Sequence, residues 1–217
     1  MRCIDLSHTI RPGMPCYSGT PGPLIQPLAS IEEHGFAEKL FTMSSHTGTH
    51  VDLPSHMLLA GSSLDAFSIE RFAGKGSAID LRGRTGGVIT VEELSPFKDL
   101  IKESEFLLLC SGWSQYWGSP AYYEGYPTLS SEAALWLTGF HLKGLGVDMI
   151  SVDVSDSDDF PVHNRLLQNG IIIVENLVCL SLLLHFSFIF CGFPLKIIDA
   201  EASPVRAVAL IDNEKKA

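Results

Sequence analysis

The chain has 217 residues, of which 46% are hydrophobic and 18% are charged. This length and balance predict one folded domain over residues 1–217 and exclude a disordered chain. The 15 basic and 25 acidic residues give a net charge of −10, which argues against binding to nucleic acid or to an anionic membrane.

The cysteines favour a reducing compartment. There are five of them, widely spaced and without a CxxC pair. No secretory signal precedes the first strand, so we expect free thiols and a cytoplasmic protein.

The residue pattern mixes strands and helices along the chain. Strands are expected over 1–10, 36–45, 76–81, 106–110, 146–154, 170–174, 195–199 and 205–211. Helices are expected over 64–72, 91–103 and 130–143. The second begins with a capping box of Thr90 and Glu93, and the third begins at Ser130 and is closed by Gly144. A proline- and glycine-rich loop is expected over 12–23, and a turn over 83–87. This mixture predicts the α/β or α+β class.

The segment 177–193 is nearly uncharged and almost long enough to span a bilayer. Buried strands also give continuous apolar runs. Because the segment contains polar residues and Pro194 follows it, two buried elements joined by a turn are favoured over a membrane helix.

The most informative stretch is HTGTHVDLPSH, residues 46–56, which holds three of the eight histidines and an aspartate. Neutral nitrogen and anionic oxygen donors in this mixture suit divalent metals. On a strand, His50 and Asp52 would face the same side. A bend at Gly48 would bring His46 close to them. We therefore expect His46, His50 and Asp52 as metal ligands, with His56 left free for proton transfer.

Two polar residues downstream could complete this site. His163 follows a short proline-containing segment, and Glu175 interrupts an apolar run. A carboxylate in an apolar strand costs several kcal/mol unless it is paired or metal-bound. An ion pair with Arg165 is the alternative to metal binding by Glu175.

The string HTGTHVDLPSH resembles the signature of the metal-dependent cyclase-like hydrolases, a family that includes bacterial-type kynurenine formamidases and isatin hydrolases. Weaker blocks resemble the family in the right order: DLSHTI at 5–10, SGW at 111–113, GVD at 146–148, VENL at 174–177 and SPVRA at 203–207. The resemblance extends over most of the chain.

The resemblance implies a three-layer β/β/α fold and a homodimer or homotetramer. It implies that His46, His50 and Asp52 hold one metal, and that Asp52 and Glu175 bridge to a second metal held by His163. It also implies that His56 transfers protons.

The resulting hypothesis is hydrolysis of an amide bond, of the aryl formamide or cyclic amide type, in a small-molecule substrate by metal-bound hydroxide. One or two divalent ions, Zn²⁺ or Mn²⁺, are expected per subunit. Tyr17, Ser111 and Trp113 are candidate substrate contacts, although packing of buried loops would explain them equally well. A non-catalytic metal or small-ligand binding protein is the alternative, and a free His56 argues against it. A partner-interaction protein has little support, although residues 182–193 could pack in a subunit interface.

Overall fold

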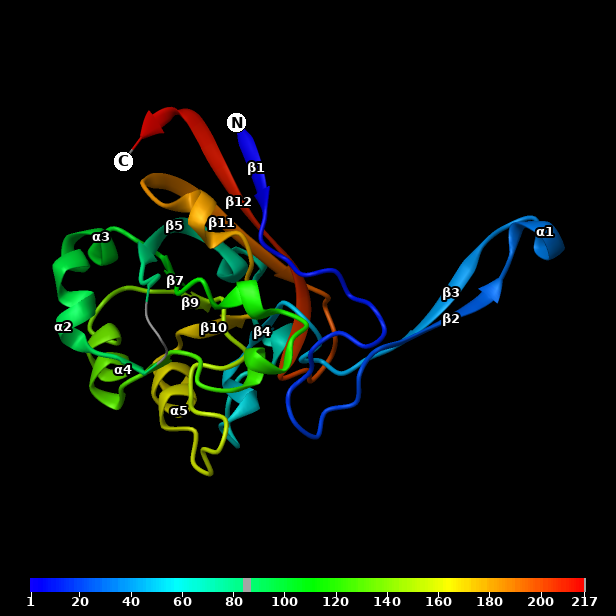
Figure 1. Ribbon diagram of the computed structural model, residues 1–217, viewed down its shortest axis with the longest axis horizontal. Coiled ribbons are helices and arrows are strands. Elements are labelled where there is room, and N and C mark those ends of the chain that lie inside the picture. Colours follow the sequence, from blue (N-terminus) through cyan, green and yellow to red (C-terminus); the bar gives the residue numbers. More distant parts are fainter. Residues whose placement is uncertain (84–86, 217) are drawn as a thin grey trace.

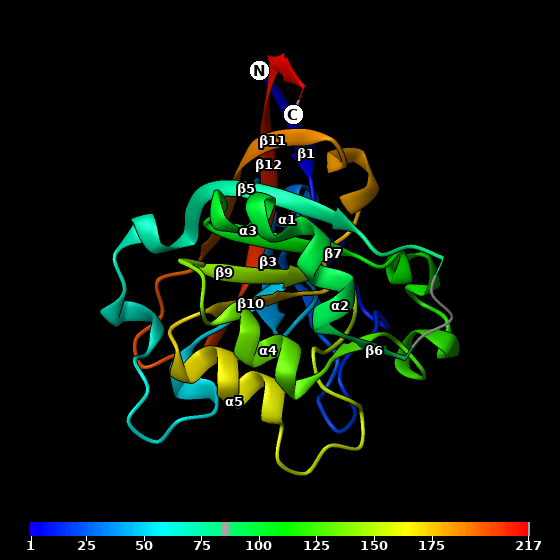
Figure 2. The same ribbon diagram turned by 90° about the vertical axis from the view of Figure 1, so that its left-hand side faces the viewer.

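The computed structural model describes residues 1–83 and 87–216, without the side chains of 213–216. Eight strands form one strongly curled sheet (Figures 1 and 2). In sheet order they are β1 (Arg2–Asp5), β12 (Ala202–Lys216), β11 (Phe186–Pro194), β5 (Ala73–Asp80), β7 (Phe106–Cys110), β9 (Gly144–Val147), β10 (Ile172–Glu175) and β4 (His50–Asp52). Since β12 also pairs with β4, the sheet closes into a barrel-like ring. The turn expected over 83–87 lies mostly outside the described residues.

The strands β5, β7, β9 and β10 run parallel and form the buried centre of the sheet. All five residues of β7 are buried, as expected for a parallel strand covered on both faces. Leu107 and Leu109 enter one hydrophobic core, whereas Phe106 and Leu108 enter another. The alternation of side chains along this strand therefore separates two cores.

The two cores divide the molecule into three layers. One core lies between the parallel strands and the helices α2 (Val91–Leu94), α3 (Lys98–Lys102), α4 (Ser131–Leu137) and α5 (Pro161–Gln168), which cover one face of the sheet (Figure 2). The other core lies between the parallel strands and β1, β11 and β12. The predicted α/β class with β/β/α layers is confirmed.

A two-stranded arm projects from the body formed by the main sheet and its helices. It is formed by β2 (Leu24–Ala29) and β3 (Glu38–Thr42), and the short helix α1 (Ile31–His34) closes its tip. Figure 1 shows the arm projecting well beyond the rest of the molecule. The strand predicted over 36–45 is thus present, but outside the main sheet, and β2 was not predicted.

Short elements complete the chain. The strands β6 (Val88–Ile89) and β8 (Thr128–Leu129) pair with each other. The 3₁₀ turns are η1 (Pro54–His56), η2 (Leu64–Ala66), η3 (Ile69–Phe72), η4 (Ser95–Phe97), η5 (Trp113–Tyr116), η6 (Pro120–Tyr123) and η7 (Leu180–Leu183).

The predicted helices are shorter than expected. The helix over 64–72 is replaced by η2 and η3, because Ser68 between them is extended. The helix over 91–103 begins with the predicted capping box of Thr90 and Glu93, but η4, which contains Pro96, separates α2 from α3. The helix over 130–143 ends at Leu137.

Gly144 does not close a helix, as the sequence suggested, but begins β9. A Cβ atom at Gly144 would lie 2.6 Å from Phe106, and one at Gly146 would lie 2.4 Å from Leu108. These glycines are therefore required by close packing between strands. The strand predicted over 146–154 stops at Val147, where Asp148 turns to bind the backbone of Ser111 and Gly112.

The apolar segment 177–193 forms η7 and β11, so the prediction of two buried elements is confirmed. No helix in the described parts of the chain is long and apolar enough to cross a membrane. The strand expected over 195–199 is wrong: this stretch is a loop, in which Asp199 has a left-handed backbone.

Candidate metal centre

The centre begins at a sharp bend before β4. Gly48 has φ +67°, and a Cβ atom there would lie 3.0 Å from the side chain of Met14. Only glycine adopts this conformation without strain. The bend brings the ring centroids of His46 and His50 to 5.0 Å. The bend expected at Gly48 is thereby confirmed.

Asp52 lies at the middle of the cluster and is buried. Its Oδ1 atom is 2.9 Å from Nδ1 of His46 and 3.4 Å from Nε2 of His50, and its Oδ2 atom is 3.7 Å from Nε2 of His163. Among the described residues, no hydrogen bond reaches either oxygen. A buried carboxylate without hydrogen bonds is costly. A divalent cation between these donors would satisfy it, so the residues fit a metal.

Glu175 brings a second carboxylate to the same place. It ends β10 and pairs directly with His50 of β4. Its carboxylate oxygens lie 3.5 Å from Nε2 of His50 and 3.3 Å from Nε2 of His163. Arg165 is exposed on α5 and makes no ion pair with Glu175 among the described contacts. The geometry therefore favours the metal alternative for Glu175.

His163 is presented by the first turn of α5. Phe160 has φ +43° before Pro161, and the chain then enters the helix. Asp153 accepts hydrogen bonds from the backbone N–H groups of Val162 and His163 and lies 2.7 Å from Nδ1 of His163. The carboxylate thus fixes the ring and leaves Nε2 facing Asp52 and Glu175.

His50 and His46 are also oriented by polar groups that lie outside the cluster. Nδ1 of His50 lies 2.8 Å from the carbonyl oxygen of Gly48, which also accepts a hydrogen bond from Asn176. Nε2 of His46 lies 3.3 Å from Glu201, and Ser45 donates to the same carboxylate at 2.5 Å.

Asp153 and Glu201 were not predicted from the sequence as part of the site. Asp153 could have been found in the acidic segment ten residues before His163. Glu201 has no local signal, because it is brought in by the last strand.

His56 ends the turn η1, which begins one residue after the end of β4. Its ring centroid is 4.4 Å from that of His46 and 5.9 Å from that of His163. Two groups of donor atoms each lie within 4.8 Å of one another: His46, Asp52 and His56 form one, and His50, Asp52 and Glu175 form the other. Asp52 belongs to both groups. The first group includes His56, which was expected to be free for proton transfer, and neither group includes His163.

The imidazoles of the cluster differ in the direction of their pKa shift: two pKa values are raised and one is lowered. Burial opposes the charged form of His50, but Asp52 and Glu175 outweigh it and raise its pKa to about 9. The pKa of His163 is also raised, because the attraction of Asp153, Asp52 and Glu175 outweighs burial. Burial lowers the pKa of His56 to about 4, so this ring is neutral near pH 7.

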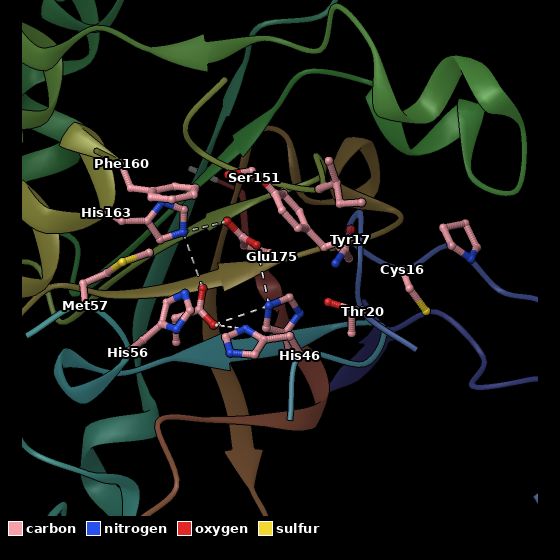
Figure 3. A pocket seen from close by; sticks show the side chains of 15 residues that line it. Cys16, Tyr17, Thr20, His46, His56, Met57, Ser151, Phe160, His163 and Glu175 are labelled. Atoms are coloured by element: carbon pink, nitrogen blue, oxygen red, sulfur yellow. Dashed lines mark ion pairs between the residues drawn. The ribbon is translucent and has the colours of Figure 1, made fainter. Parts of the chain in front are cut away.

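The cluster forms the floor of a cavity of about 320 Å³ (Figure 3). Its lining contains all six predicted metal and catalytic residues together with Tyr17 and Phe160. The other lining residues are Pro15, Cys16, Thr20, Met57, Ile150, Ser151 and Asn176.

Ser111 and Trp113 are placed elsewhere. The Ser111 hydroxyl donates to Asp148, and the indole N–H of Trp113 donates to the carbonyl of Tyr122. Neither residue lines the cavity, so the expectation that they contact substrate is not supported by this geometry.

Comparison with known proteins identifies the family. The model of the putative cyclase family matches residues 4–154. The chain belongs to this cyclase family. The cyclase chain is 31% identical to a kynurenine formamidase of Bacillus cereus, and the match covers 94% of the chain and 95% of the relative. The resemblance inferred from residues 46–56 is thereby confirmed.

Solved structures share the fold of the cyclase chain. Isatin hydrolase A from Ralstonia solanacearum superposes with a TM-score of 0.88 at 24% identity, over 97% of this chain and 92% of that one. A structure described as a potential metal-dependent hydrolase with cyclase activity has a TM-score of 0.81 at 25% identity and covers 99% of both chains.

Proposed function

We propose that this cyclase-family protein is a metal-dependent hydrolase that cleaves an amide bond in a small molecule. The observation that carries the proposal is Asp52, a buried carboxylate that accepts no described hydrogen bond, surrounded by imidazoles and Glu175 beneath a cavity. The names of the relatives, a kynurenine formamidase and an isatin hydrolase, support an aryl formamide or a cyclic amide as the substrate class.

A divalent metal in this centre would supply a nucleophilic hydroxide at neutral pH by lowering the pKa of its bound water. His46, His50, Asp52, His163 and Glu175 would hold it, as one ion or as two that share Asp52. The nitrogen donors suit Zn²⁺, and the carboxylates also admit Mn²⁺.

The remaining residues of the site would bind substrate and move protons. Tyr17 and Phe160 line the cavity and would hold a planar substrate. His56 is neutral near pH 7 and half-buried beside the ligands, so it would accept a proton from the nucleophile and donate it to the leaving nitrogen. The protein is proposed to act in the cytoplasm as a homo-oligomer.

The test is turnover by purified protein loaded with Zn²⁺ or Mn²⁺, screened against aryl formamides, isatin and simple lactams. Hydrolysis of at least one class that stops when the metal is chelated is the expected result. Metal binding without hydrolysis of any class would instead indicate a non-catalytic binding protein.

His56→Gln separates proton transfer from metal binding. We expect wild-type metal content by elemental analysis and a loss of kcat of about 10²–10⁴-fold, the usual size of a general acid–base contribution. His141→Gln, which removes an exposed histidine away from the cavity, is the control. If His56→Gln loses metal, His56 is a ligand, and the role proposed for it is wrong.

A further inference from the structure

The loop over residues 8–23, called the wall loop below, lines one part of the cavity. It contributes Pro15, Cys16, Tyr17 and Thr20 to the lining (Figure 3). All of its residues are described, and none of them belongs to a helix or a strand. Its described internal backbone hydrogen bonds only close two turns, at 11–14 and 17–20. The position of Tyr17 therefore depends on contacts between the wall loop and other segments.

A segment rich in aromatic residues lies against the wall loop. The segment 113–123 contains η5 and η6, and its aromatic residues are Trp113, Tyr116, Trp117, Tyr122 and Tyr123. The indole N–H of Trp113 donates to the carbonyl of Tyr122 at 3.0 Å. The ring of Trp117 packs edge-on against that of Tyr122, with 5.0 Å between the centroids. Because Tyr122 is fully buried, it anchors this segment to the body of the molecule.

Two contacts join the wall loop to the aromatic segment. The imidazole of His8 stacks on the indole of Trp117, with ring centroids 3.8 Å apart and planes 6° from parallel. Burial lowers the pKa of His8 to about 4, so it stacks as a neutral ring near pH 7. The backbone N–H of Cys16 donates to the hydroxyl of Tyr123 at 3.3 Å. The first contact fixes the start of the wall loop, and the second fixes the residue next to Tyr17.

The side chain of Tyr17 makes only a weak polar contact of its own. Its hydroxyl donates to the carbonyl of Ser155 at 3.3 Å, which is long for an O–H···O hydrogen bond, and Ser155 is exposed. The contacts of the wall loop with the aromatic segment are therefore needed to place the ring. Neither Trp117 nor Tyr123 lines the cavity, so both can affect a substrate only through the wall loop.

We propose that Trp117 and Tyr123 are positioning residues, which hold the wall loop so that Tyr17 lies against the substrate. This inference rests on the proposed hydrolase function, in which Tyr17 holds a planar substrate. It also gives the aromatic segment a role in the reaction that needs no contact between the segment and the substrate.

Steady-state kinetics of the metal-loaded full chain, on the best substrate of the screen, test this role. Trp117→Ala should raise KM by about 3–10-fold, the size of a lost aromatic pair. Its kcat should stay nearly constant, because a displaced Tyr17 weakens binding of substrate and transition state alike. Trp117→Phe keeps a ring against His8 and should restore most of the wild-type KM. Tyr123→Phe removes only the hydroxyl that accepts from Cys16 and should also raise KM.

Trp136→Ala is the matched control. Trp136 is a half-buried tryptophan on α4 that packs edge-on against Phe140, with 4.7 Å between the ring centroids, and it does not line the cavity. Its removal should also cost stability but leave KM at the wild-type value. A purely structural role of Trp117 would instead lower kcat at constant KM, because a smaller fraction of the protein would be folded.

Hydrogen exchange measured by mass spectrometry tests the same contacts without turnover. In metal-loaded protein without substrate, Trp117→Ala and Tyr123→Phe should take up deuterium faster over residues 12–20 than the wild type and Trp136→Ala do, at equal metal content. If no substrate is hydrolysed, the proposed function fails, and exchange alone decides the positioning role. For Trp117→Ala, an unchanged KM, a fall in kcat at constant KM, or unchanged exchange over residues 12–20 would overturn the proposal.

Discussion

Each histidine that faces Asp52 has its second ring nitrogen occupied by an acceptor. Glu201 lies against His46, the carbonyl of Gly48 against His50, and Asp153 against His163. Such partners fix which nitrogen points at the metal and increase its basicity. The proposed ligands are therefore oriented by these partners, which should in turn control the affinity of the proposed metal centre.

Asp153→Asn tests this control at the level of one residue. An amide is a weaker acceptor for the N–H of His163, so we expect metal affinity to fall by about 10–100-fold. Competition with a chromogenic chelator measures the affinity. Asp156→Asn, an exposed aspartate in the same segment, should have no effect. Equal metal affinities for Asp153→Asn and the wild type would show that Asp153 only accepts the backbone hydrogen bonds at the start of α5.

Among the secondary-structure elements, β4 and the bend before it contribute most of the residues of the site. The three residues of β4 include two of the proposed ligands, and the bend at Gly48 adds a third, His46. The turn η1 then presents His56. Residues 46–56 thus supply four of the six predicted metal and catalytic residues, because the bend, the strand and the turn follow one another closely in the sequence.

Gly48→Ala should damage both the fold and the centre. An alanine at positive φ costs about 1–2 kcal/mol, and its Cβ atom would lie 3.0 Å from Met14. We expect a lower free energy of unfolding in urea and a lower metal-to-protein ratio. Gly13→Ala has a similar φ of +70° with no atom within 4 Å. It should lose comparable stability and keep its metal. If Gly48→Ala also keeps its full metal content, the bend does not determine the ligand geometry.

The sequence was most informative where a pattern is local. The spacing in residues 46–56 predicted the bend and the side that His50 and Asp52 share, and the apolar run of β7 predicted a buried strand. Gly144 was misread as a helix end, because its role is to let Phe106 of another strand approach. The partnership of Glu201 with His46 and the projection of the arm depend on tertiary structure, so no local pattern could predict them.

Across the whole molecule, the closed sheet holds β4 on both edges. It pairs with β10 on one side and with β12 on the other. Asp52, His50 and Glu175 are thereby buried together in the interior, where their charges interact strongly. The stability of the protein should therefore respond to pH through this centre.

In the metal-free protein, the free energy of unfolding should fall as pH rises from about 6.5 to about 9. The pKa of His50 is raised to about 9, so its protonated form stabilises the fold fully below the ordinary imidazole value of 6.5, and this contribution is lost as pH passes 9. The pKa of His163 shifts in the same direction. Burial lowers the pKa values of His8 and His56 to about 4, so these residues change the free energy of unfolding only below about pH 6.5.

Urea unfolding at a series of pH values measures this change. The metal-loaded protein should show the opposite trend, because metal binds neutral imidazoles. His141→Gln should keep the slope of the wild type. A metal-free protein whose stability is constant or rises through the window would contradict the assignment.

The pairing of β4 with β12 has a consequence for biosynthesis. Residues 50–52 pair with residues 202–204, so β4 cannot complete its pairing before residue 204 has been synthesised. Because contacts between residues far apart in the sequence form slowly, a nascent chain that lacks residues 202–204 carries its histidines without the strand pairing that positions them. The proposed metal binding should therefore not precede the synthesis of residues 202–204, and truncation before residue 202 should abolish it.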